Sequence, residues 1–173
     1  TQTTFDPSLP QNGNADMIEV TNFGNYANDL SGFTANLYYT GFGGPGGGTL
    51  NTISKTLPKG TVLAPGKQMI FVLGTGADNA AANVYYLSAT GPGFVDMSSF
   101  GAAGFAFMDT TGNPLDVIGF NNITFPTSKI TAADWKGNVA IPANGPTAYA
   151  GVTRVGTSDH NDSTDWVPSN AGN

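Results

Sequence analysis

The chain has 173 residues, of which 39% are hydrophobic and 11% aromatic, so it carries enough apolar side chains to bury a core and is not intrinsically disordered. Its formal net charge is −6 and its six basic residues are dispersed, which excludes the basic patch expected of a protein that binds nucleic acid or an anionic membrane. It has no cysteine and one histidine, which excludes disulfides, thiol catalysis and zinc sites built from several histidines.

Short strands separated by turns are predicted along almost the whole chain. The first is centred on residues 18–20, and residues 33–39 alternate between apolar and polar side chains, as expected of a half-buried strand. Residues 69–73 are apolar throughout, which predicts a central strand covered on both faces. Further strands are predicted at residues 84–87, 105–108, 115–120 and 152–155.

Helix signals are limited to single turns. Thr131 and Asp134 have the spacing of a capping box, but Gly137 follows almost at once, and residues 78–83 could form another turn. The fold class predicted from these elements is all-β: a β-sandwich of about seven to ten antiparallel strands with long loops and at most short helical turns.

Four sequence blocks carry a resemblance to a known family. They are residues 16–33 (DMIEVTNFGNYANDLSGF), 57–73 (LPKGTVLAPGKQMIFVL), 105–119 (FAFMDTTGNPLDVIG) and 153–168 (TRVGTSDHNDSTDWVP). In this order they resemble the lamin-tail domain, an immunoglobulin-like β-sandwich of nuclear lamins and many secreted bacterial proteins. The resemblance implies an immunoglobulin-like fold for this chain, and it brings no set of catalytic residues with it.

The length predicts one domain over residues 1–173. Three stretches lie outside the resemblance and are expected to be insertions around residues 41–56, 75–103 and 121–149. Long loops on a rigid sandwich commonly carry the specificity of such domains.

The N-terminal segment departs from the family pattern. Lamin-tail domains open with an apolar strand, whereas this chain offers only the short polar segment Thr1–Phe5. If Thr3, Thr4 and Phe5 do not pair within their own sheet, the sheet edge is left open to a strand from a neighbouring molecule. Self-assembly through this edge is one hypothesis, and a short strand that pairs within its own domain is the alternative.

A polar segment near the C-terminus is a candidate calcium site. Asp159, Asn161, Asp162 and Asp165 place hard oxygen ligands within seven residues, although their spacing is not that of an EF-hand. The resemblance implies another role, in which Asp159 and Asn161 shape a turn through side-chain-to-backbone bonds and Trp166 enters the core. Calcium is therefore the one cofactor considered, with a metal-free turn as the alternative.

The residue inventory predicts that the chain is not an enzyme. His160 is the only histidine, no G-x-S-x-G motif occurs, and Asp109 and Asp116 match turn and strand positions of the family rather than a glycosidase pair. Glu19, the sole glutamate, is expected to be a structural hydrogen-bond acceptor within the first strand.

Location outside the cell is expected from composition. Only 10% of the residues are charged, a composition typical of secreted, structural or assembly-prone β proteins. The chain begins at Thr1, which is expected either after removal of a signal peptide, the interpretation that the composition favours, or in an excised domain. Asn122 and Asn161 lie in glycosylation sequons. No apolar run reaches the roughly 18–20 residues of a membrane helix, so no membrane insertion is expected.

Two functions are consistent with these observations. The first is a non-catalytic extracellular structural or adhesive protein, which contacts copies of itself or other envelope proteins. The second is a carbohydrate-binding module, in which loop aromatics stack on sugar rings. The candidate aromatics for the second function are Tyr38, Tyr85, Tyr86, Trp135 and Tyr149.

Overall fold

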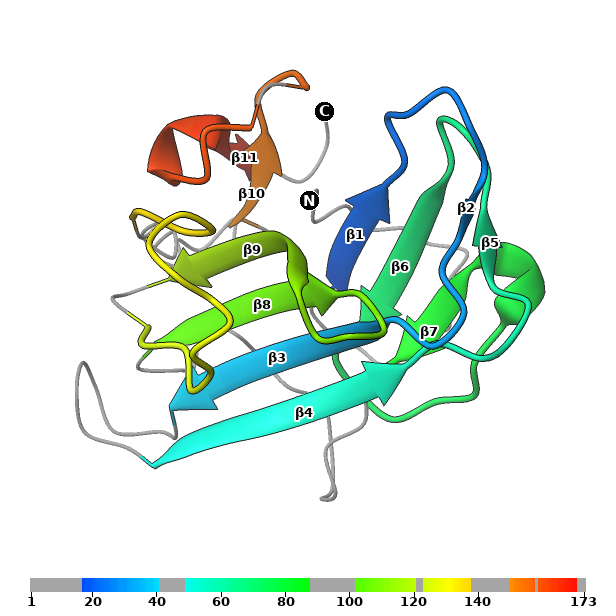
Figure 1. Ribbon diagram of the computed structural model, residues 1–173, viewed down its shortest axis with the longest axis horizontal. Helices are drawn as coiled ribbons and strands as arrows, with labels where there is room; N and C mark the ends of the chain where they lie inside the picture. Colours follow the sequence, from blue (N-terminus) through cyan, green and yellow to red (C-terminus); the bar gives the residue numbers. More distant parts are fainter. Residues whose placement is uncertain are drawn as a thin grey trace.

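The computed structural model describes residues 17–40, 49–87, 102–120, 123–137, 150–157 and 159–170 (Figure 1). Within these ranges the chain consists of strands, turns and two short 3-10 helices, which confirms the predicted all-β class. The strands are β1 (Met17–Thr21), β2 (Asn28–Asp29), β3 (Thr34–Thr40), β4 (Leu50–Thr56), β5 (Val62–Leu63), β6 (Gln68–Val72), β7 (Val84–Tyr86), β8 (Ala103–Met108), β9 (Pro114–Phe120), β10 (Ala150–Arg154) and β11 (Trp166–Asn170). The 3-10 helices are η1 (Ala80–Ala82) and η3 (Ser163–Asp165).

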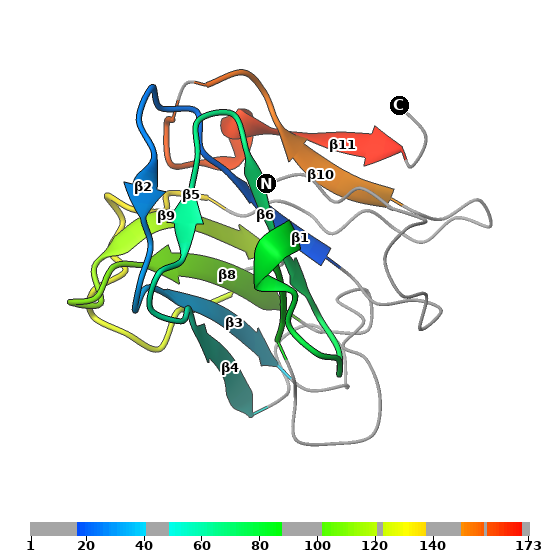
Figure 2. The same cartoon turned by 90° about the vertical axis from the view of Figure 1, so that its right-hand side faces the viewer.

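Two sheets form the body of a sandwich. One has the strand order β1-β6-β7 and the other the order β4-β3-β8-β9, and neither closes into a barrel. Figures 1 and 2 show the two sheets facing each other, with the two-stranded ribbon β10–β11 near β1 and β9. A second ribbon, β2–β5, completes the described strands.

Aromatic packing between the sheets forms the centre of the core. Phe71 of β6 is fully buried, and its ring centroid lies 5.8 Å from that of Phe105 and 6.1 Å from that of Phe107, both on β8. Tyr85 of β7 lies 6.1 Å from Phe71 on the side of its own sheet. These tilted pairs join the two sheets because β6 and β8 are interior strands of their sheets.

The predicted two-sided burial of residues 69–73 is confirmed. Met69 and Phe71 of β6 belong to the core between the sheets, while Val72 packs in a second cluster with Val84 and Tyr86. Packing of Val72 and the partly buried Ile70 in this second cluster explains why the sequence of β6 lacks the alternation of a strand with one solvated face.

Burial of β3 differs from the sequence prediction. Its alternating pattern predicted one exposed face, yet Asn36 and Tyr38 are buried together with Ala35 and Leu37. The ring of Phe125, which comes from residues 123–137, packs edge-on against Tyr38 at 5.5 Å. A distant segment therefore covers the face that the local pattern assigned to solvent.

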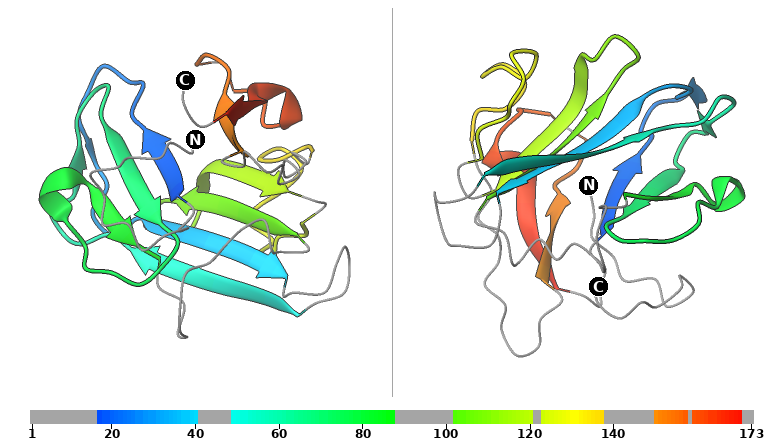
Figure 3. Two further views of the ribbon diagram at one scale, coloured as in Figure 1. Left: turned by 180° about the vertical axis from the view of Figure 1, so that it is seen from behind. Right: turned by 90° about the horizontal axis from the view of Figure 1, so that it is seen from below.

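The relative direction of β6 and β7 also differs from the sequence prediction. The prediction was of antiparallel strands, and the pairs of the four-stranded sheet are antiparallel, but β6 and β7 run parallel. The connection between them passes through η1, which begins after the N-cap Asn79 and ends at Asn83 in a left-handed conformation (Figure 3). A parallel pair needs such a crossover, because a two-residue hairpin can only reverse the chain.

Two of the stretches expected to be insertions supply strands. Residues 50–56 form β4, which pairs with β3 along the full length of both strands, and residues 84–86 form β7. Of the third stretch, residues 123–137 carry the capping box: Thr131 N donates to Asp134 Oδ2, and Ala133 N donates to Thr131 Oγ1. As predicted, it produces a turn rather than a full helix.

We expect Phe71→Ala to lower the free energy of unfolding by about 3–5 kcal/mol, because it leaves a cavity between the two sheets that cannot close without moving both. Urea unfolding followed by tryptophan fluorescence measures this loss. The matched control is Leu115→Ala on β9, where the side chain is 52% exposed; its effect should stay within about 0.5 kcal/mol. Equal losses in the two variants would contradict this description of the core.

Candidate functional site

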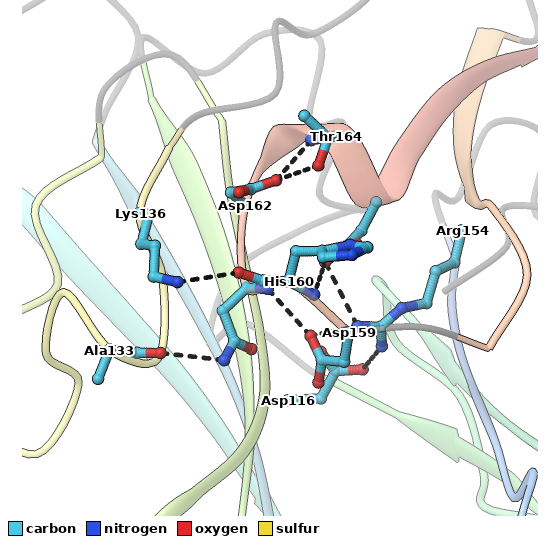
Figure 4. A network of polar contacts seen from close by, with 10 residues as sticks. Asp116, Ala133, Lys136, Arg154, Asp159, His160, Asp162 and Thr164 are labelled. Carbon is cyan, nitrogen blue, oxygen red and sulfur yellow. Dashed lines mark hydrogen bonds and ion pairs between the residues drawn. The ribbon is translucent and has the colours of Figure 1, made fainter.

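Arg154, the last residue of β10, organises the polar segment near the C-terminus (Figure 4). Its guanidinium lies 2.5 Å from Asp159 Oδ1 and 3.2 Å from Asp116 Oδ2, and it lies 3.7 Å from Asp165 Oδ2. The guanidinium carbon also lies 5.7 Å from the ring centroid of Trp166, its register partner on β11. One cation thus pairs with carboxylates that come from β9, from the turn and from η3.

Asp165 is the buried member of this network, with 2% of the residue exposed. It accepts a hydrogen bond from the backbone N of His160 at 2.8 Å and lies 2.5 Å from His160 Nδ1. Asp162 instead caps η3 at its N-terminus, where it accepts from the backbone N and the hydroxyl of Thr164. The side chain of His160 is 63% exposed, so one edge of its ring meets solvent while the other is held by Asp165.

Contacts to residues 131–137 hold the turn from its other side. The side-chain amide of Asn161 donates to Ala133 O at 2.9 Å, and Lys136 N donates to Asn161 O at 2.7 Å. Asn161 has φ +57°, a left-handed conformation that asparagine tolerates better than most residues. Trp166, which follows η3, is 6% exposed and belongs to the core. The structural turn that the resemblance implied for this segment is confirmed by these bonds.

The four predicted calcium ligands lie within one turn of the chain, and each of the three carboxylates among them accepts at least one hydrogen bond from the protein. Asp159 accepts from Asn161 N at 3.1 Å and contacts Arg154, while Asp162 and Asp165 are bound as described above. Within the described residues, no three His, Cys, Asp or Glu are grouped so that they could hold a metal ion. Calcium binding at this turn stays a prediction.

Hydrogen bonds and burial shift the pKa values of these carboxyl groups in different directions. Burial alone would raise the pKa of Asp165, but the bonds from the His160 side chain and backbone, together with Arg154, hold it below its usual range. Bonds from Thr164 lower the pKa of Asp162. Burial raises the pKa of Asp116, against the opposing charge of Arg154.

The other carboxylates considered in the sequence have local structural partners. Asp109 Oδ1 accepts from Thr111 N and Asn113 N in the β8–β9 hairpin, whereas Asp116 contacts Arg154. Glu19 is 3% exposed and accepts from the Gln68 side-chain amide at 3.4 Å, which confirms its predicted role as an acceptor. These groups serve three separate parts of the fold.

The aromatic residues predicted to bind sugars lie in the core where the structure describes them. Tyr85, Tyr86 and Trp135 are 1%, 7% and 9% exposed, and Tyr38 is 5% exposed, which corrects the expectation that they are exposed on loops. Stacking on a sugar needs an open ring face, and the rings of these residues are covered by the two sheets and by their connections. Tyr149 lies outside the described residues.

Two other described aromatics are exposed, and the sequence did not single them out as candidate functional residues. Phe23 is 60% exposed and Tyr26 is 82% exposed, both on the loop of residues 22–27 after β1. We call these two residues the aromatic corner. Their sequence context, N-F-G-N-Y, indicated a turn correctly, but a turn signal does not show which side chains point into solvent.

Buried Asn22 fixes the backbone of the aromatic corner. Its side-chain amide donates to Tyr26 O at 2.8 Å and to Leu63 O at 2.9 Å, and its Oδ1 accepts from Gly24 N at 2.9 Å. Its backbone N and O bond to Lys67 O and Gly66 N in the neighbouring turn. The two exposed rings therefore sit on a loop that hydrogen bonds hold in one conformation.

The proposed N-terminal assembly residues Thr3, Thr4 and Phe5 lie outside the described residues. In the part of the chain that the structure describes, β1 pairs with β6 and with no second strand. The helices in this part are all too short or too polar to cross a membrane.

Comparison with known proteins does not assign a family. A scan against protein-family models and a search of curated proteins both gave no match.

We expect Asp165 to make the stability of the chain sensitive to acid. Its folded pKa lies below the unfolded value, so its contribution is fully present above the unfolded pKa and is lost as the pH falls through the folded pKa, below about pH 4. Asp165→Asn should lower stability at neutral pH by about 2 kcal/mol and flatten its decline in acid. Urea unfolding at a series of pH values measures both effects.

In the same series, the loss of stability of His160→Ala in acid should lie between that of the unmodified chain and that of Asp165→Asn. The reason is that the Asp165 carboxylate of this variant still contacts Arg154 and still accepts the bond from the backbone N of residue 160. An unchanged acid dependence in Asp165→Asn would contradict this assignment.

For the polar turn, the metal-free alternative predicts equal melting temperatures in excess calcium and in a chelator, because hydrogen bonds and ion pairs within the protein hold the turn without a metal. A calcium site predicts a higher melting temperature with calcium, since a ligand that binds only the folded state stabilises it. Asp162→Asn serves as the matched variant, and any calcium-dependent rise should be lost in it if Asp162 is a ligand.

Proposed function

We propose that this chain is a non-catalytic structural or adhesive protein of the extracellular space or cell surface. It acts through protein–protein contacts, with copies of itself or with other envelope proteins, on an immunoglobulin-like sandwich of the lamin-tail type. Four sequence blocks of that type support the family part of the proposal, and their described residues lie on strands and turns of the sandwich.

The observation that carries the proposal is the aromatic corner. Exposed aromatic side chains dominate the binding energy of many protein interfaces, since each ring buries a large area with few rotatable bonds. Phe23 and Tyr26 are 60% and 82% exposed, although most of the other aromatics among the described residues are buried. The hydrogen bonds of Asn22 fix the loop beforehand, so less conformational entropy is lost when a partner covers the rings.

Surface charge supports contact formation as well. Charged residues are depleted at the centres of protein interfaces, because each charge must lose its water. The loop of residues 22–27 contains no Asp, Glu, Lys or Arg. A partner could therefore cover the corner without burying an unpaired charge.

Assembly beyond a dimer needs more than one contact. When two copies pair through the same surface about a two-fold axis, that surface is buried in the dimer and cannot bind a third copy. Filaments or layers therefore require a second surface. The N-terminal segment with Thr3, Thr4 and Phe5 is one proposed second contact, through strand addition to an open sheet edge.

A carbohydrate-binding module is the second candidate, and the exposure of Tyr26 favours it. The open ring could stack on a sugar, and the exposed side chain of Asn28 on the adjoining strand β2 could bond hydroxyl groups. In this form of the carbohydrate-binding proposal, the aromatic corner contacts the sugar in place of the buried residues Tyr85, Tyr86 and Trp135.

We expect the full chain to self-associate and the double variant Phe23→Ser, Tyr26→Ser to associate about tenfold or more weakly, because the variant removes the apolar contact area. Sedimentation velocity over a range of concentrations measures this. Leu115→Ser, which changes an exposed apolar residue on β9, is the matched control and should behave like the unmodified chain. A version without residues 1–10 tests the N-terminal contact separately.

A chain that stays monomeric at every concentration would contradict self-assembly. A glycan array probed with the same proteins separates the two candidates: binding to sugars that is lost only in the corner variant would support the carbohydrate-binding alternative.

A further inference from the structure

The outer edge of β4 is a long and regular sheet edge. β4 pairs with β3 through seven consecutive residue pairs without a register shift, and no other described strand pairs with it. Figure 3 (right) shows β4 from below, running across the front of its sheet. Exposed strand edges of this kind pair readily with another strand unless the sequence prevents it.

The other end of the same sheet is protected. β9 begins with Pro114, and its pairing with β8 contains a register shift between Phe107 and Met108. Proline and bulges are devices that natural sheets use against edge-to-edge pairing. β4 contains neither, which leaves β4 as the edge of this sheet suited to accept a strand.

The direction of the outer backbone groups of β4, which pair with no described strand, follows from the bonds of β3. Thr40 N donates to Ala102 O on the β8 side, while Phe33 O accepts from Leu57 N on the β4 side. Successive residues of an antiparallel strand bond alternately to the strand on one side and to the strand on the other. The backbone N–H and C=O groups of Leu37 therefore point toward β4, and those of its register partner Ile53 point toward β3. The backbone N–H and C=O groups of Leu50, Thr52, Ser54 and Thr56 therefore point away from the sheet.

The side chains of β4 offer little resistance to a second strand. Asn51, Thr52, Ser54 and Thr56 are exposed and uncharged, and Lys55 is the only charged residue of the strand. An edge lysine usually opposes pairing, but Lys55 Nζ lies 2.5 Å from Asp78 Oδ2 in its own chain. The charge of Lys55 is therefore already paired within its own chain.

The sequence of β4, LNTISKT, is compatible with itself in antiparallel register. When two copies are centred on Ile53, Thr52 lies opposite Ser54 of the second copy, and Asn51 lies opposite Lys55. Leu50 lies opposite Thr56, so no like charges face each other. In this register the outward-pointing residues meet as hydrogen-bonded pairs.

We propose that two copies of this chain associate by antiparallel pairing of their β4 strands about a two-fold axis at Ile53, which joins the two four-stranded sheets into one sheet of eight strands. The contact is isologous and closes as a dimer. It deepens the proposed function, on which its role in assembly rests, and it leaves the aromatic corner free for a second contact.

The decisive variant is Thr52→Pro. Its N–H points away from β3, so proline removes an interface donor and leaves the β3–β4 bonds intact. Thr52→Val is the matched control, because it keeps both the backbone N–H and a β-branched side chain. Sedimentation velocity should show loss of the dimer in Thr52→Pro and an unchanged dimer in Thr52→Val.

A charge-swap experiment covers the case in which Thr52→Pro fails to fold. Chains with Thr52→Lys and Ser54→Lys, or with Thr52→Glu and Ser54→Glu, place like charges opposite each other in a homodimer and should be monomeric alone. When the two variants are mixed, opposite charges face each other, and a heterodimer should form. Failure of the mixture to associate would overturn the proposed register.

Amide hydrogen exchange gives an independent readout. The amides of Thr52 and Ser54 should become protected as the protein concentration rises, whereas that of Ile53 should be protected at all concentrations because it bonds to β3. Protection of Thr52 and Ser54 that does not change with concentration would overturn the proposal.

The outcomes separate this proposal from the proposed function. Association that survives the β4 variants but is lost in the Phe23→Ser, Tyr26→Ser variant overturns β4 pairing and leaves the adhesive function supported. Association that is lost only in the β4 variants supports β4 pairing and overturns the role of the aromatic corner. A chain that is monomeric throughout overturns β4 pairing and self-association at the aromatic corner, and leaves contact with other envelope proteins as the form of the proposed function that stands.

Discussion

Packing of Phe71 between the two sheets is the interaction on which the rest of the structure depends. The ring reaches Phe105 and Phe107 on the opposite sheet, and all three belong to interior strands. Each sheet has one face that must leave water, and neither could bury that face alone. The edge strands β4, β9, β1 and β7 are held through their neighbours β3, β8 and β6, so the surfaces available to a partner are set indirectly by this contact.

The polar turn near the C-terminus places charged side chains directly beside the core. Asp165 is almost fully buried, and this is tolerable because Arg154 and His160 surround it with donors. Arg154 in turn lies over Trp166, so the ion pairs and the aromatic anchor of β11 support one another. The acidic residues thus serve first to close the sandwich where β10 and β11 meet β9.

The two proposed contact surfaces differ in physical character. The aromatic corner offers apolar area on a loop held by Asn22, whereas the β4 edge offers few charges and backbone groups that no described strand pairs with. Apolar contacts are non-directional, while backbone pairing fixes strand direction and register. A protein that carries both could combine one specific two-fold contact with a second, more adaptable one, which is what extended assembly requires.

Much of the local structure in this protein follows from the order of its residues, although β4 lies in a stretch that the sequence indicated as an insertion. Alternation and apolar runs located β1, β3 and β6, and the Asp and Asn residues of 159–165 predicted a turn because their side chains bond to nearby backbone groups. Which residues meet solvent was settled only when the segments packed together. Phe125 covers Tyr38, η1 leads β7 back parallel to β6, and Phe23 and Tyr26 are left exposed while Tyr85 and Trp135 are buried. Exposure depends on contacts between segments far apart in the chain, and local periodicity carries no information about such contacts.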